Sequence, residues 1–192
     1  MTSSLAPEYI VPRLRGRFGR PYLYAEACES TQRLFGPEHG EGAVAATEEQ
    51  TEGRGRLGRR WLSPPRKSVL CSVLLEPQVE TPRLPELTLV TGEACAEAIA
   101  AVTGLEPEIK LPNDVLLRDR KTAGVLAEAR DGRVVLGVGI NVNLTKEELP
   151  GDVETPATSL LVEAGREVDR AELLVELLTV LERRYDDWVI QG

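Results

Sequence analysis

Apolar residues recur along this chain with two spacings, and each spacing predicts a different kind of element. Every second residue from 134 to 142 is valine, leucine or isoleucine, so we expect a strand over Arg133 to Asn143 with one buried face. The opposite face of that strand is nearly bare and carries Val135, Gly137, Gly139, Asn141 and Asn143. Because glycine weakens a strand, this face indicates the close approach of a ligand or of another backbone.

Several shorter apolar runs also predict strands. The dipeptide Asp131-Gly132 favours a tight hairpin turn between the last of these runs and the strand described above. The runs span Tyr22 to Ala27, Ala43 to Thr47, Ser68 to Leu75, Glu108 to Leu111, Val115 to Arg118 and Thr122 to Ala129.

Two longer segments follow the helical period instead. Glu86 to Val102 has one apolar stripe, and Asp169 to Trp188 has another, preceded by a capping box of Asp169 and Glu172. A short helix is expected to open at Glu29-Ser30-Thr31-Gln32, with Ser30 or Thr31 as its N-cap. This order of elements predicts an α+β fold: a mixed, mainly antiparallel sheet with helices on one face.

The first twenty residues have no clear period, since Pro7 and Pro12 interrupt them and an Arg/Gly cluster follows. We therefore expect residues 1–20 to form an irregular, solvated lead-in and residues 21–192 to form a single domain. The only histidine, His39, lies in a Gly/Pro/Glu-rich stretch and is expected at the surface.

Composition narrows the classes of function. The formal net charge is -8, which argues against general binding to nucleic acid. Cys28, Cys71 and Cys95 lack the spacing of a metal site, and we interpret them as reduced, small hydrophobic residues of a cytoplasmic protein. No apolar run is long enough to span a membrane, and the N-terminus lacks the pattern of a signal peptide.

The segment from Gly53 to Trp61 departs from this acidic background, because arginine and glycine alternate through most of it. Glycine lets backbone N–H groups approach a phosphate, and arginine presents a planar charged fork to the same oxygens. The Arg/Gly loop therefore indicates a phosphate-bearing ligand, with Trp61 placed to stack on a base. An exposed loop that binds RNA, or one that is simply solvated, would have a similar amino-acid sequence.

Lysine is scarce here, with four residues against nineteen arginines, which makes its positions informative. Lys110 begins the motif Lys-Leu-Pro-Asn-Asp, and Lys121 begins Lys-Thr-Ala-Gly. A compact ammonium suits a phosphorus centre in a way that the broad guanidinium of arginine does not. Lysines without a role remain the alternative for either position taken alone.

Together these motifs resemble those of the biotin protein ligases. Residues 50–61 resemble the adenylate loop of that family. Residues 110–115 and 121–128 resemble its central motif at the family's spacing, 137–142 its next strand, and Glu29-Ser30-Thr31-Gln32 its first biotin contact. The resemblance covers roughly residues 20 to 190. It implies the catalytic domain of biotin–lipoate ligases, which is similar to that of class II aminoacyl-tRNA synthetases.

The resemblance implies that biotin and ATP react to give biotinyl-5′-AMP and pyrophosphate, and that a lysine of a biotin carboxyl carrier protein then takes the biotinyl group. Lys121, Arg54 and Asp114 are the implied catalytic residues. Asn113 and Asp114 are the implied ligands of Mg²⁺. The implied biotin contacts are Ser30, Thr31, Gln32, Gln50, Arg54, Gly55, Arg56, Lys121 and Gly124. The implied nucleotide contacts are Arg54, Arg56, Trp61, Asn113, Lys121 and Asn141.

Compared with that family, we expect this chain to have neither a DNA-binding helix-turn-helix nor a C-terminal β domain, and hence no specific DNA partner. The resemblance also allows a homodimer through a sheet edge near the active site. Three alternatives stay open: a lipoate–protein ligase of the same fold, an RNA-binding module that uses residues 53–61, and a protein that binds biotin without catalysis.

Overall fold

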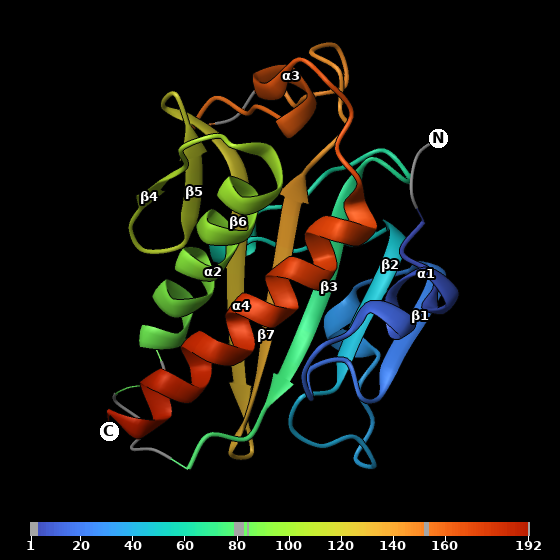
Figure 1. The fold of residues 1–192 in the computed structure, drawn as a ribbon, viewed down its shortest axis with the longest axis vertical. Helices are drawn as coiled ribbons and strands as arrows, with labels where there is room; N and C mark the ends of the chain where they lie inside the picture. Colours follow the sequence, from blue (N-terminus) through green and yellow to red (C-terminus); the bar gives the residue numbers. More distant parts are fainter. Residues whose placement is uncertain (1–3, 79–82, 84, 152–153, 192) are drawn as a thin grey trace.

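A seven-stranded sheet forms the centre of the molecule (Figure 1). The computed structural model describes residues 4–78, 83, 85–151 and 154–191. The strand order is β1-β2-β3-β7-β6-β5-β4, and each neighbouring pair is antiparallel except β1 and β2, which are parallel. The strands are β1 (Tyr22–Cys28), β2 (Val44–Gln50), β3 (Ser68–Leu75), β4 (Glu108–Lys110), β5 (Asp114–Leu117), β6 (Arg120–Arg130) and β7 (Arg133–Asn141). The mixed, mainly antiparallel sheet predicted from the sequence is confirmed.

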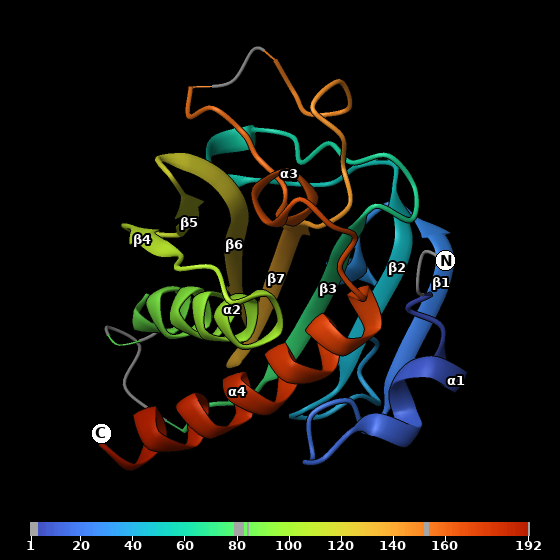
Figure 2. The same cartoon turned by 45° about the horizontal axis from the view of Figure 1, so that its top comes forward.

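Two long helices, α2 (Glu86–Thr103) and α4 (Arg170–Ile190), lie across one face of this sheet (Figures 1 and 2). The predicted stripe of α4 is buried, and Asp169 caps the helix by accepting the amide N–H groups of Ala171 and Glu172. The shorter elements are α1 (Pro7–Ile10), α3 (Leu160–Ala164) and the 3₁₀ turns η1 (Val11–Arg13), η2 (Thr31–Arg33) and η3 (Arg56–Gly58). In the described residues no helix is long and apolar enough to cross a membrane.

The hairpin of β6 and β7 has the turn that the sequence predicts. Asp131 and Gly132 both have positive φ, 52° and 77°, which matches the tight two-residue turn of a twisted hairpin. Along β7, Leu136 and Ile140 are fully buried in the core beneath the helices. The face with Gly137 and Gly139 is therefore turned away from α2 and α4.

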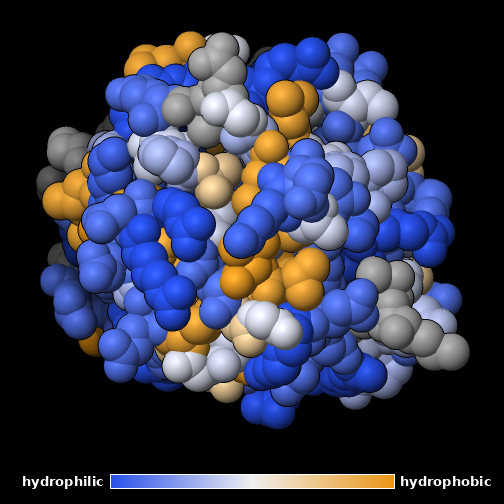
Figure 3. Space-filling model, turned by 90° about the horizontal axis from the view of Figure 1, so that it is seen from above, coloured by the Kyte–Doolittle hydropathy of each residue, from blue (hydrophilic) through white to orange (hydrophobic). Residues whose placement is uncertain are grey.

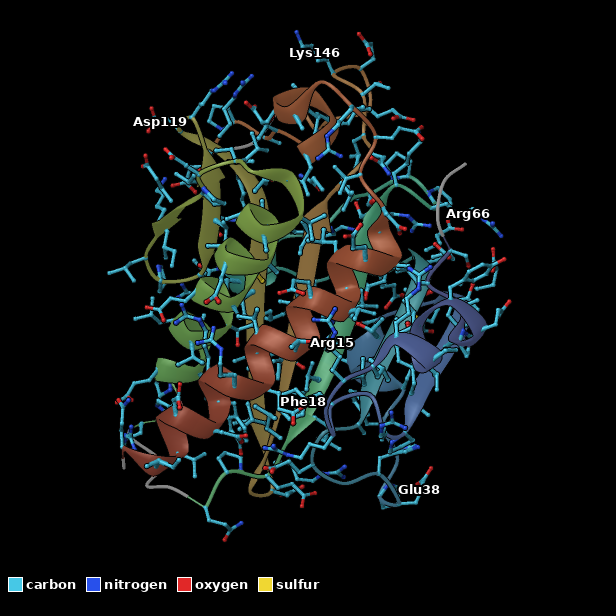
Figure 4. The ribbon with its side chains drawn as sticks, in the orientation of Figure 1. Arg15, Phe18, Glu38, Arg66, Asp119 and Lys146 are labelled. Carbon is cyan, nitrogen blue, oxygen red and sulfur yellow. The ribbon has the colours of Figure 1, made fainter. Side chains whose placement is uncertain are left out.

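The expected solvated lead-in was wrong. Residues 7–13 form α1 and η1, and apolar side chains at Leu5, Ile10, Leu14 and Phe18 are buried in the main core. Figure 4 shows Phe18 close to α4, and its ring lies 6.0 Å from that of Tyr185, centroid to centroid. Pro7 and Pro12 interrupt this stretch, so its apolar residues do not predict a continuous helix, and only the tertiary contacts reveal their role.

A buried ion pair joins the N-terminal segment, the sheet and α4. Arg170 donates to Glu48 Oε2 at 2.7 Å and to the carbonyl of Ser68 at 3.0 Å, and both charged side chains are 1% exposed. The second oxygen of Glu48 accepts the amide of Leu5 at 2.8 Å and the hydroxyl of Ser4 at 3.0 Å. One carboxylate thus ties together segments that are far apart in the sequence.

Two smaller expectations also need correction. The side chain of His39 is only 14% exposed rather than at the surface, and its Nδ1 accepts the amide of Gly36 at 2.8 Å. The short helix after Glu29 is a single 3₁₀ turn, and Ser30 occupies the cap position without a side-chain capping bond.

Candidate functional site

A cavity of about 840 Å³ opens on the glycine side of the sheet, opposite α2 and α4. Its walls come from β2, β5, β6, β7, the η2 turn, the Arg/Gly loop and the segment after Pro150. Figure 3 looks onto the end of the molecule where α3 lies, and apolar residues gather there amid charged ones. Every residue proposed from the sequence lines this cavity: Ser30, Thr31, Gln32, Gln50, Arg54, Gly55, Arg56, Trp61, Asn113, Asp114, Lys121, Gly124 and Asn141.

The inner end of the cavity is a buried polar cluster around Thr31. Its backbone amide donates to Gln50 Oε1 at 2.9 Å, and its hydroxyl lies 2.7 Å from the Ser72 hydroxyl and 3.2 Å from Gln50 Oε1. Ser30 and Thr31 are 3% and 2% exposed. Because these groups already hold one another in place, a ligand with matching donors and acceptors would meet a prearranged set of partners.

Side chains, rather than empty space, occupy the bare face of β7. A Cβ atom added to Gly139 would lie 2.5 Å from Cε2 of Trp61, and one added to Gly137 would lie 2.8 Å from Nε2 of Gln32. The strand glycines therefore provide room for Trp61 and Gln32, and Gln32 donates to the carbonyl of Leu126 at 3.0 Å. The close approach expected at these glycines comes from the protein itself.

A lysine and a carboxylate meet on neighbouring strands at the cavity wall. Lys121 Nζ on β6 lies 2.7 Å from Asp114 Oδ1 on β5, with 26% and 18% of the two side chains exposed. The same ammonium lies 5.7 Å from the centroid of the Trp61 ring. A compact, partly desolvated cation is therefore fixed beside the largest aromatic surface of the cavity.

Asn113, next in the chain to Asp114, connects this pair to the Arg/Gly loop. Its Oδ1 accepts from Arg56 at 3.1 Å, and its Nδ2 donates to the carbonyl of Val125 at 3.1 Å. Asn141 points into the cavity from the end of β7, is 4% exposed, and donates to the carbonyl of Thr158 at 3.1 Å. Neither amide is loose, so both can orient a bound group without first being ordered themselves.

The Arg/Gly loop folds back on itself as a short hairpin. Arg54 and Arg60 form an antiparallel bridge, and the amide of Trp61 donates to the carbonyl of Gly53 at 2.9 Å. A Cβ at Gly53 would lie 2.5 Å from the carbonyl oxygen of Trp61, which explains that glycine. Arg54, Arg56, Arg59 and Arg60 all line the cavity, so an acidic chain concentrates positive charge at this one opening.

Sequence reasoning missed the wall formed by the segment after Pro150. Glu154, Thr155 and Ala157 line the cavity, and Glu154 pairs with Arg59 at 2.6 Å. Lys110 donates to the Thr155 hydroxyl at 3.1 Å. The segment carries no hydrophobic period or motif, and its contact with Lys121 is made through backbone groups.

The described part of the chain offers no cluster of three or more His, Cys, Asp or Glu side chains that would hold a metal ion. Cys71 reaches the cavity wall, and burial raises the pKa of its thiol to about 12. A thiol with so high a pKa is almost entirely protonated near neutral pH and is a poor nucleophile. The cavity therefore favours chemistry by positioned charges and amides over covalent catalysis by cysteine.

Residues 24–144 match the model of the biotin/lipoate A/B protein ligase family. The chain belongs to that family.

Curated relatives and solved structures support the same family. The chain is 35% identical over 183 residues to the bifunctional ligase/repressor BirA of Bacillus subtilis, an alignment that covers 91% of this chain and 56% of that protein. It is 40% identical over 152 residues to the biotin–[acetyl-CoA-carboxylase] ligase of Mycobacterium tuberculosis, covering 77% and 56%. The biotin protein ligase of Aquifex aeolicus in complex with biotin and ATP superposes with a TM-score of 0.81 at 33% identity, covering 89% of this chain and 72% of that one. The chain thus spans little more than half the length of these curated relatives.

Proposed function

We propose that this domain is an ATP-dependent biotin–protein ligase. It joins biotin to AMP with release of pyrophosphate, and then passes the biotinyl group to a lysine of a biotin carboxyl carrier protein. One observation carries the proposal: the residues of all four family motifs, spread from Ser30 to Asn141, line a single cavity around the Lys121–Asp114 pair.

The buried polar end receives the ring of biotin. A ureido ring has N–H donors and a carbonyl acceptor, which suit the hydroxyl and amide groups of Ser30, Thr31 and Gln50. Gln32 and Gly124 frame the rest of the molecule. A Cβ atom at Gly124 would lie 3.0 Å from Trp61 and 3.1 Å from Lys121, so a larger residue would crowd both side chains. The biotin chain then extends from the buried end toward Lys121.

Lys121 serves the first step. A carboxylate oxygen of biotin attacks the α-phosphorus of ATP, and the bond from that phosphorus to the bridging oxygen breaks as pyrophosphate leaves. Negative charge grows on the phosphoryl oxygens in the transition state. An ammonium already fixed by Asp114 neutralises that charge without having to reorganise.

The Arg/Gly loop and its neighbours hold the nucleotide. Arg54 and Arg56 face the phosphate, Gly55 lets the backbone approach it, and Trp61 stacks on adenine. Asn113 and Asn141 supply the remaining polar contacts. With the loop over the adenylate, water is kept from the reactive acyl–phosphate bond.

In the second step an acceptor lysine, as the free amine, attacks the acyl carbon of biotinyl-AMP. The bond from that carbon to the phosphate oxygen breaks, and AMP leaves. Asp114, next to the reacting centre, accepts the proton that the amine loses as the amide forms. No covalent enzyme intermediate is needed.

Mg²⁺ fits this site as an ion that binds together with the nucleotide. The Oδ1 of Asn113 is engaged by Arg56, and the carboxylate of Asp114 is paired with Lys121, so the protein offers little beyond one shared carboxylate. Mg²⁺ commonly binds through one or two carboxylates together with substrate phosphates. When bound, the ion would offset the charge of the leaving pyrophosphate, and the carboxylate of Asp114 would hold it on the protein side, with Asn113 next to it in the chain.

The acceptor is a carrier domain that presents an exposed lysine. Free cysteines in the described residues fit the cytoplasm, where thiols stay reduced. A homodimer through a sheet edge and the lack of a specific DNA partner stay predictions of the sequence.

Incubation of the protein with biotin, MgATP and a carrier domain tests the proposal. We expect pyrophosphate release and a biotinyl adduct on the carrier by mass spectrometry, with no stable adduct on the protein itself. Lipoate replaces biotin in a parallel reaction. Transfer of lipoate alone would identify a lipoate ligase, and biotin binding without pyrophosphate release would identify a non-catalytic binding protein. Salt-dependent binding of single-stranded RNA with no response to biotin or ATP would support the RNA-binding alternative.

A further inference from the structure

The backbone of Lys121 is held from outside the sheet. β6 and β7 pair up to Ala123 and Ile140, so Lys121 lies beyond the last residue pair that joins these two strands. The segment 156–158 takes over there: the amide of Lys121 donates to the carbonyl of Pro156 at 2.7 Å, and the amide of Thr158 donates to the carbonyl of Lys121 at 2.9 Å. Lys121 and Ala157 accordingly form a parallel bridge.

Thr158 also holds the second polar residue of this wall. Its carbonyl accepts the side-chain amide of Asn141 at 3.1 Å, and the residue is fully buried. One residue therefore contacts Lys121 through its amide and Asn141 through its carbonyl. A shift of Thr158 would move both groups at once.

Glu163 on α3 fixes Thr158 in turn. The Thr158 hydroxyl donates to Glu163 Oε1 at 2.5 Å, and Arg120 donates to the same oxygen at 2.7 Å. Arg118 lies 3.6 Å from the other carboxylate oxygen, and the Glu163 side chain is 1% exposed. A buried carboxylate with two arginines and a hydroxyl around it resists displacement, because each partner would lose a charge-assisted contact.

Thr158 and Glu163, which we call the clamp, contact two consecutive residues of β6. Arg120 contacts Glu163 through its side chain, and Lys121, the next residue, contacts Thr158 through its backbone. Asp119, labelled in Figure 4, marks the outer tip of the turn that carries Arg118 and Arg120. Glu163 itself does not line the cavity and so acts only through its neighbours.

We propose that Thr158 and Glu163 are positioning residues for adenylation, which set the location of Lys121 and Asn141. This inference rests on the proposed function and deepens it. A misplacement of about 1 Å at a reacting centre can cost on the order of a hundredfold in rate, so a small relaxation of this clamp is enough to matter.

The test compares Thr158→Val, Glu163→Gln and Thr158→Ser. Val has nearly the shape of Thr but no hydroxyl, Gln lacks the carboxylate charge, and Ser keeps the hydroxyl. We expect Thr158→Val and Glu163→Gln to slow single-turnover formation of biotinyl-AMP by about tenfold or more, the effect of roughly one lost contact in the transition state. Biotin affinity should stay near the wild-type value, because the Thr31–Gln50 cluster is untouched. Thr158→Ser should restore most of the rate.

Thr91→Val is the matched control. Thr91 is also fully buried, and its hydroxyl makes one hydrogen bond, to the carbonyl of Leu87 at 2.6 Å within α2. This variant should lower thermal stability comparably while leaving the rate unchanged. If Thr158→Val and Glu163→Gln kept their rates, or if Thr91→Val lost as much rate, the positioning role would be wrong.

A second readout does not depend on activity. Amide hydrogen exchange of the Lys121 backbone should accelerate in Thr158→Val and Glu163→Gln but not in Thr91→Val, because the hydrogen bond to Pro156 opens more often. Unchanged exchange at Lys121 would contradict the clamp. Wild-type protein that forms no biotinyl-AMP would overturn the proposed function instead, while the exchange experiment would still decide whether the clamp exists.

Discussion

The ammonium of Lys121 lies 2.7 Å from the carboxylate of Asp114, and the two side chains come from adjacent strands of one antiparallel pair. The pairing orients the cation while leaving part of it open to the cavity. A positively charged residue held in this way can meet an anionic ligand with little loss of side-chain freedom.

Replacing Lys121 by Arg should preserve the fold and abolish most adenylation. The broader guanidinium keeps the charge but cannot occupy the same point between Asp114 and Trp61. Loss of a charge-assisted contact costs about 1.5–3 kcal/mol, and more where the contact forms only in the transition state, so we expect a rate at least tenfold lower. Pyrophosphate release under single-turnover conditions measures this effect.

Lys146→Arg provides the matched control for that variant. Lys146 is exposed, does not line the cavity and projects from the outside of the molecule in Figure 4. Its rate should equal that of the wild type. A Lys121→Arg protein with near-normal adenylate formation would remove Lys121 from its proposed role.

Gly139→Ala should disturb the cavity through Trp61. The added methyl group would lie 2.5 Å from the indole, so the ring must move away from the sheet. Overpacking of this kind costs about 1–3 kcal/mol, and a displaced Trp61 should also weaken nucleotide binding. Chemical denaturation and isothermal titration with ATP measure the two effects separately.

The cause can be isolated with two further variants. Gly92→Ala in α2 adds a methyl group that meets no atom within 4 Å apart from the neighbouring backbone of its own helix, and it should leave stability equal or improved by about 0.5–1 kcal/mol. In a Trp61→Ala background, Gly139→Ala should cost much less than in the wild type. Equal costs in the two backgrounds would show that Trp61 is not the group displaced.

The strands and helices were predictable because their side chains encode them locally. The alternation along β7 and the apolar stripe of α4 each show one buried face, and Asp131-Gly132 fits only a narrow set of turns. The residues that line the cavity were predictable for a different reason. Their chemistry is unusual for this chain, as with Lys121 among nineteen arginines.

The parts that were not predictable are held by long-range contacts. The segment 156–158 binds Lys121 through backbone N–H and C=O groups, which do not depend on the side chain. The sequence of this segment therefore gives no signal of the contact. Leu5 and Phe18 belong to no continuous periodic pattern, and Phe18 is buried against Tyr185 of α4, more than 150 residues later. The glycines of β7 correctly indicated a close approach, but the partners Trp61 and Gln32 became evident only in three dimensions.

Glu48→Gln should destabilise the protein strongly without reaching the cavity. The change removes the negative charge next to Arg170 at a site where both side chains are 1% exposed. Breaking a buried ion pair by altering one partner typically costs about 3–5 kcal/mol. Urea denaturation measures the loss, and the slope of the transition shows whether it stays two-state.

An exposed pair supplies the contrast. Arg17 holds the pKa of the Asp186 carboxyl below its usual range, but both side chains are more than two-fifths exposed. Asp186→Asn should therefore cost no more than about 1 kcal/mol near neutral pH. The contribution of Asp186 is present above the unfolded carboxyl pKa and is lost as the pH falls through the lower folded one. Similar losses for Glu48→Gln and Asp186→Asn would contradict the buried role of Glu48.

The three cysteines should differ in reactivity in the order of their burial. Burial raises the pKa of Cys71 to about 12 and also raises the pKa of Cys95 and of half-buried Cys28. Since the thiolate is the reactive form, we expect a disulfide reagent near pH 8 to modify Cys28 slowly in the native protein and the other two only after unfolding. Cys28→Ser should abolish the native reaction, and prompt modification of that variant would contradict the burial of Cys71 and Cys95.

The raised thiol pKa values also determine how the stability of the protein changes with pH. The unfolded chain loses its thiol protons above about pH 8.5, while the folded chain keeps them, so the free energy of unfolding should decrease as the pH rises from about 9.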